Sequence, residues 1–64
     1  MSTYYTLAVR ENGIWGAQFG DYDREVVLDE KLDYQDQGYS ARDLKIIRTG
    51  DNQADIDARV AAMN

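Results

Sequence analysis

The sequence predicts a small α+β domain with the element order β-β-α-β-α. Three observations carry this prediction: an Asn-Gly turn between two strand-like segments, a long proline-free segment that ends at a glycine, and an apolar strand followed by a short amphipathic helix. We expect one domain over residues 1–64. A chain of this length buries only about 60% of the surface that its unfolded form exposes, so its core is small.

The first two strands form a predicted hairpin. The segment "YYTLAVR" (4–10) alternates with period two, and "IWGAQF" (14–19) returns after Asn12-Gly13, a pair that tolerates the positive φ of a tight turn. Gly16 indicates either a bulge or only a tolerated weak spot in the strand. On this alternation one face of the sheet carries six side chains: Tyr5, Leu7, Val9, Trp15, Ala17 and Phe19.

Two helices and a third strand follow. The first helix is expected from about Tyr22 to Gln37, where Gly38 ends it, with Asp21 or Asp23 as its cap. The segment "LKIIRT" (44–49) predicts the third strand. Asp51 or Asn52 then caps a last helix that ends near Met63 and carries one apolar stripe: Ile56, Val60 and Met63.

The connection between the second and third strands predicts the topology. A crossover helix would place the third strand beside the first and antiparallel to it, in the sheet order 2-1-3. We expect both helices to cover one face, with Trp15 and Phe19 packed against Leu28 and Leu32. The opposite face would stay uncovered as a surface for a partner or a homodimer, with these residues outward: Tyr4, Thr6, Ala8, Ile14 and Gln18.

The residue types argue against an enzyme. The chain has no histidine and no cysteine, which removes the common general base, the common nucleophile and the soft metal ligands. No glycine-rich phosphate loop is present, and the calcium-loop pattern that starts at Asp33 fails because Leu44 stands where a glutamate is needed. We therefore expect no catalytic residues, no cofactor and no metal site.

Charge and hydropathy restrict the partners. The net charge of −5 disfavours direct binding to nucleic acid and leaves a basic protein partner open. No segment is apolar enough to predict a membrane helix, and no secretory signal is visible, so we expect a cytoplasmic location.

Acidic residues follow one line of the first helix. The spacing i, i+4, i+8, i+11 puts four carboxylates along about 16 Å of one side. This face is either a solvated surface or a phosphate-like row that docks on a basic surface. With two flanking tyrosines, the candidate partner-binding residues are Glu25, Asp29, Asp33, Asp36, Tyr22 and Tyr34.

Two segments, "FGDYDREVV" and "DLKIIRTGDNQADID", resemble small proteins of unassigned function that bacteriophages and prophages encode. The resemblance implies a location in the cytoplasm of the bacterial host. It favours an accessory protein that binds and modulates or inhibits a host protein, with the acidic helix as a DNA mimic. The alternative is an oligomerising structural module without inhibitory activity.

Overall fold

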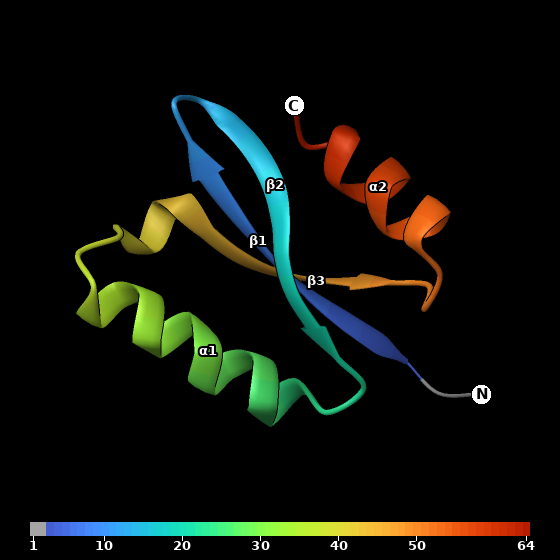
Figure 1. Ribbon diagram of the computed structural model, residues 1–64, viewed down its shortest axis with the longest axis horizontal. Helices are drawn as coiled ribbons and strands as arrows, with labels where there is room; N and C mark the ends of the chain where they lie inside the picture. Colours follow the sequence, from blue (N-terminus) through green and yellow to red (C-terminus); the bar gives the residue numbers. More distant parts are fainter. Residues whose placement is uncertain (1–2) are drawn as a thin grey trace.

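Three antiparallel strands form one sheet in the order β2-β1-β3 in the computed structural model, which describes residues 3–64. The predicted α+β class and strand order are confirmed (Figure 1). A single turn of 3-10 helix, η1, precedes β3. The elements in chain order are β1 (Tyr4–Glu11), β2 (Ile14–Asp21), α1 (Arg24–Asp36), η1 (Ala41–Asp43), β3 (Leu44–Thr49) and α2 (Gln53–Ala61).

Local sequence explains where these elements begin and end. Asn12 and Gly13 both have positive φ, 54° and 79°, which suits the tight turn between β1 and β2. The Asp23 carboxylate accepts a hydrogen bond from the Glu25 backbone N–H at 2.9 Å and caps α1. Asn52 caps α2 in the same way, and Gly38, with φ of 107°, follows the end of α1.

The two helices lie on opposite faces of the sheet, so the expectation that both cover one face is wrong (Figure 1). Leu7 and Val9 of β1 pack with Val27 of α1 in one apolar cluster. Thr6 and Ala8 alternate with them and therefore face the other side, yet they are only 2% and 0% exposed. Helix α2 covers them with its two buried side chains, Ile56 and Val60. Because Thr6 and Ala8 are small, they allow a helix to approach a face that the sequence pattern suggested was open.

A β-bulge in β2 separates two aromatic residues that the alternation placed together. Leu7 pairs with Phe19 but Ala8 pairs with Ala17, which leaves Gln18 as an extra residue in β2. Phe19 therefore joins the α1 side, where it packs against the apolar cluster. Trp15 pairs with Arg10 on the α2 side instead. The bulge is at Gln18 and not at Gly16, and the expectation of a shared face for Trp15 and Phe19 is wrong.

The helix residues that were expected to contact these aromatics also differ. Leu32 is 49% exposed, whereas Val27 is fully buried beneath the sheet. Val27 is thus the central contact of α1, and Leu32 lies on the outer side of that helix. The predicted packing against Leu32 is wrong.

The sheet leaves its two edges, and not a face, available to a partner. The molecule measures 34 × 25 × 13 Å, and its thinnest dimension is close to the width of about three strands, roughly 10 Å. Helix α2 covers the face that was expected to form a dimer surface, while β2 and β3 form the edges. No helix within residues 3–64 is long and apolar enough to cross a membrane.

Candidate partner-binding site on helix α1

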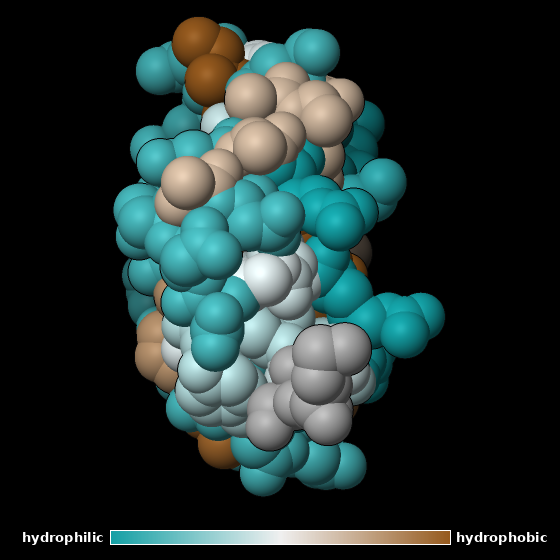
Figure 2. All heavy atoms as spheres, turned by 90° about the vertical axis from the view of Figure 1, so that its right-hand side faces the viewer, coloured by the Kyte–Doolittle hydropathy of each residue, from teal (hydrophilic) through white to brown (hydrophobic). Residues whose placement is uncertain are grey.

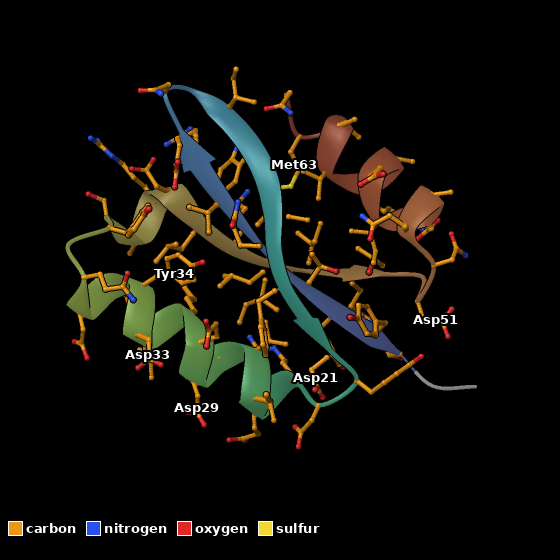
Figure 3. All side chains as sticks on the ribbon, viewed as in Figure 1. Asp21, Asp29, Asp33, Tyr34, Asp51 and Met63 are labelled. Atoms are coloured by element: carbon orange, nitrogen blue, oxygen red, sulfur yellow. The ribbon has the colours of Figure 1, made fainter. Side chains whose placement is uncertain are left out.

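The four predicted carboxylates lie on the outer side of α1. Successive helical residues turn by about 100°, so these carboxylates lie about 160–240° around the helix from the buried Val27. All four are exposed, and Figure 3 shows Asp29 and Asp33 pointing away from the sheet. We call this set the acidic row: Glu25, Asp29, Asp33 and Asp36.

Basic side chains do not neutralise the acidic row. In the part of the chain that the structure describes, ion pairs join Arg10 with Asp43 at 2.8 Å and Arg59 with Asp55 at 3.7 Å. Neither pair includes a member of the row. Like charges at i, i+4 destabilise a helix by a few tenths of a kcal/mol per pair. The row is therefore a small cost to folding that no ion pair offsets.

The charge density of the row is close to that of one nucleic-acid strand. Its members span about 16 Å along the helix axis. One strand of duplex DNA carries a phosphate about every 3.4 Å, or about five over the same length. Four carboxylates approach that number, whereas a whole duplex carries about twice as many charges. The row therefore has a charge density slightly below that of one strand and well below that of a duplex.

Two exposed apolar residues flank the acidic row. Leu32 and Val26 are 49% and 40% exposed, and they lie on either side of the row around the helix. Leu32 was predicted to be a core residue, and that prediction is wrong because it lies on the surface. Its offset of about 140° from Val27 is the signal that would have found it. Apolar side chains beside charged ones give a surface that can exclude water from a contact.

The two predicted tyrosines are not part of the acidic row. Tyr34 lies on the sheet side of α1, where it packs against the apolar cluster and meets Tyr39 edge-on at 5.2 Å between ring centroids. Tyr22 precedes the helix, and its ring meets Tyr4 edge-on at 4.9 Å. The Tyr22 hydroxyl donates a hydrogen bond to Asp51 at 2.8 Å. The structure thus keeps the carboxylates on the outer side of α1 and places both tyrosines elsewhere. Figure 3 shows Tyr34 on the sheet side of the helix, opposite Asp29 and Asp33.

The tyrosines outside the row have perturbed acidity. The hydrogen bond to the Asp51 carboxylate, with a smaller effect of burial, raises the pKa of Tyr22 above its usual 10.0. Glu11 accepts a hydrogen bond from the Tyr39 hydroxyl at 2.7 Å and raises the pKa of Tyr39 in the same way. Both hydroxyls are therefore hydrogen-bond donors that hold segments together, not groups prepared to lose a proton.

Metal binding has no support in the described structure. Within residues 3–64, no three side chains of the His, Cys, Asp and Glu types are grouped closely enough to hold a metal ion. The acidic row is linear, so its carboxylates do not converge on one point.

No protein-family model, no curated protein and no solved structure matches this chain.

Proposed function

We propose that this chain is a small acidic accessory protein that binds a protein with a basic surface and modulates or inhibits it. The acidic row on α1 is the contact. One observation carries the proposal: four exposed carboxylates lie on one side of a helix, with no ion pair to neutralise them within residues 3–64. A basic surface that normally receives nucleic acid is the partner that such a row suits best.

The phage resemblance supplies the biological setting of the proposal. The segment "FGDYDREVV" contains the start of α1 and the first member of the acidic row, Glu25. A protein carried by a phage or prophage would meet its partner in the cytoplasm of the bacterial host. It would act by binding and not by catalysis, without a cofactor and without touching nucleic acid itself.

The second candidate is an oligomerising module that joins copies through the open sheet edges. Its support is the exposure of both edges of a sheet with only three strands. Two features oppose it. The β3 edge carries the exposed charges Lys45 and Arg48, and the bulge at Gln18 limits regular pairing along β2 to the residues before it, so neither edge suits a long strand of a second copy. The acidic row is therefore the better-supported contact.

The experiment compares two doubly neutralised variants in capture from bacterial lysate at low and high salt. The test variant combines Asp29→Asn with Asp33→Asn. The control combines Glu11→Gln with Asp57→Asn, which removes the same charge outside the row and leaves amide oxygens that can accept the bonds from Tyr39 and Gln53. We expect the parent and the control to retain a salt-sensitive basic partner that the test variant loses.

The folding of both variants provides the internal check. The test variant should unfold at the same denaturant concentration as the parent, or be more stable by a few tenths of a kcal/mol, because repulsion along the helix falls. Capture that is equal for the test variant and the control, with the same salt dependence, would reduce the row to a solvated face.

A further inference from the structure

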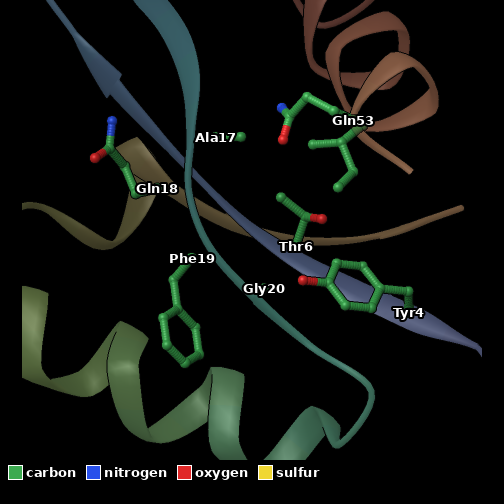
Figure 4. Close-up of a pocket in the computed structure, with 8 residues that line it drawn as sticks. Tyr4, Thr6, Ala17, Gln18, Phe19, Gly20 and Gln53 are labelled. Atoms are coloured by element: carbon green, nitrogen blue, oxygen red, sulfur yellow. The ribbon is translucent and has the colours of Figure 1, made fainter. Parts of the chain in front are cut away.

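A hollow of about 210 Å³ lies on the α2 side of the sheet, between β2 and the first turns of α2 (Figure 4). It is on the face opposite α1 and is separate from the acidic row. Figure 2 shows the α2 side as mostly hydrophilic or intermediate in hydropathy, with its apolar side chains in separate spots on the described residues. The residues that line the hollow are Tyr4, Thr6, Ala17, Gln18, Phe19, Gly20, Gln53 and Ile56.

Small residues create this hollow. Thr6, Ala17 and Gly20 provide little bulk between the sheet and α2. The Tyr4 ring lies against Gly20, where a Cβ atom would come within 2.5–2.8 Å of the ring and its hydroxyl. Only glycine lets the ring take this position without moving, so Tyr4 forms one wall of the hollow.

The volume restricts what the hollow can hold. An apolar cavity of about 150 Å³ in another protein accommodates one benzene molecule, whereas sites for drug-sized ligands measure about 300–1,000 Å³. At about 210 Å³, this hollow suits one ring-sized group and is too small for a nucleotide or a similar cofactor.

Two hydrogen-bond acceptors in the wall of the hollow, on Thr6 and Gln53, suit a ring that carries a hydrogen-bond donor. Thr49 uses its single hydroxyl hydrogen on the Gly50 carbonyl at 2.9 Å, so Thr6 must donate to Thr49 at 3.0 Å. The Thr6 oxygen then offers only acceptor capacity. Gln53 donates through Nε2 to Asp57 at 2.8 Å, which leaves its Oε1 as a second acceptor. An indole N–H or a phenol O–H would satisfy these acceptors.

The edge of β2 provides a place for the chain that would deliver such a ring. Residues 14–20 carry no charge. The Asn64 side chain already pairs with this edge: its Oδ1 accepts from the Trp15 N–H at 2.7 Å and its Nδ2 donates to the Trp15 carbonyl at 3.3 Å. Outward-facing backbone groups recur every second residue, so Ala17 is the next to face outward, and it lines the hollow.

We propose that the hollow binds one tryptophan or tyrosine side chain from a short partner segment that pairs with β2 at Ala17, before the bulge and beside Asn64. The segment provides backbone hydrogen bonds, and the ring in the hollow selects the sequence. This site does not depend on the acidic row, since the two lie on opposite sides of the molecule.

The test is an NMR titration of the full chain with two blocked tripeptides, threonine-tryptophan-threonine and threonine-alanine-threonine. We expect the tryptophan peptide to bind with a dissociation constant on the order of millimolar, as suits so small a ligand. It should shift the amide signals of Ala17, Gly20 and Ile56. The alanine peptide should bind at least about tenfold more weakly, because it leaves the hollow empty.

Two variants test whether the tryptophan ring of the peptide occupies the hollow. Ala17→Leu should fill the space and weaken the tryptophan peptide about tenfold, while Ala58→Leu, on an exposed position of α2, should not. If Ala17→Leu disturbs the parent spectrum, Gln53→Leu fills the hollow from the helix side and should give the same loss. Equal binding of the two peptides, no shifts with either, or unchanged binding in the folded filling variant would overturn the proposal.

Discussion

The two faces of the sheet are packed by different kinds of side chain. On the α1 face, Leu7, Val9, Val27 and Leu44 are at most 2% exposed, and aromatic and aliphatic residues surround them. On the α2 face the buried strand residues are small or carry a hydroxyl (Thr6, Ala8 and Thr49), and they lie beneath two buried aliphatic residues of the helix. It also retains a hollow of about 210 Å³.

The buried apolar area that stabilises this small domain and the hollow therefore lie on different faces of the sheet. Buried apolar area stabilises a fold by about 25 cal/mol per Å², and most of the large apolar side chains lie on the α1 face. The α2 face contributes less to the free energy of unfolding, because its hydroxyls and small residues bury less apolar area. The hollow beside the β2 edge and the outer side of α1 therefore both lie outside the main apolar cluster.

The largest expected loss of stability comes from a substitution on the α1 face. Leu7→Ala should lower the free energy of unfolding by about 2–5 kcal/mol, because Leu7 is fully buried and leaves a cavity. A domain of this size has only about 3–10 kcal/mol in total, so the variant should lose a large share of its stability. Ile56→Ala, beside an existing hollow, should cost less in the same urea titration. Equal losses would show that the two faces contribute equally.

The second prediction compares two aromatics of one strand. Phe19→Ala should cost about 3 kcal/mol, because Phe19 packs against the apolar cluster. Trp15→Ala should cost only about 1–2 kcal/mol, since Trp15 is half-buried. Its main partner is the Arg10 guanidinium, whose Cζ lies 5.1 Å from the centroid of the Trp15 ring. Thermal unfolding of both variants would measure the difference, and a larger loss for Trp15→Ala would contradict the assignment of faces.

The sequence predicted the elements and strand order better than it predicted the packing. Turns and helix ends depend on local chemistry, such as the positive φ of Asn12-Gly13 or the cap at Asp23, and these signals are present in the chain itself. The bulge at Gln18 has no such signal, because glutamine suits a regular strand equally well. One extra residue reverses the alternation, so every face assignment in β2 before it, including that of Trp15, was reversed.

The candidate site shows the same limit. The acidic row was predictable, because residues separated by three or four positions stay on one side of any regular helix. Which residues face the sheet depends on tertiary packing, and a broad apolar side left this open. The structure turns Val27 and Tyr34 inward and leaves Leu32 outside. The hollow was not predictable at all, since it depends on α2 lying against a face that the alternation left uncovered.

A third prediction concerns the hydroxyl pair on the α2 face. Thr6→Val keeps the shape of the side chain but removes the donor to Thr49, a residue that is only 9% exposed. Thr49 keeps its own hydrogen bond to the Gly50 carbonyl, so the variant loses one hydrogen bond, and we expect a loss of about 0.5–1.5 kcal/mol by urea unfolding. Thr6→Ser keeps the hydroxyl and should retain most of the hydrogen bond. If Thr6→Val were as stable as the parent, the hydroxyl pair would add nothing to this face.

The smallest expected effect is a pH dependence that comes from two tyrosines beside α1. Tyr22 joins the start of α1 to the turn before α2 through Asp51, whereas Tyr39 joins the end of α1 to the hairpin through Glu11. Both hydrogen bonds raise the tyrosine pKa above the usual 10.0. A raised pKa in the folded state means that this contribution is fully present below about pH 10 and is lost as pH rises through the folded pKa.

Urea unfolding at several values between about pH 8 and pH 11.5 would measure this loss. The variant that combines Tyr22→Phe with Tyr39→Phe should lose less stability over this interval than the parent, because it has no hydroxyl to ionise at either position. The single variants show which link matters more. If Tyr22→Phe removes more of the pH dependence than Tyr39→Phe, the hydrogen bond between Tyr22 and Asp51 limits stability at high pH. That bond joins the two sides of the sheet. Identical pH profiles for the parent and the double variant would contradict the raised pKa values of Tyr22 and Tyr39.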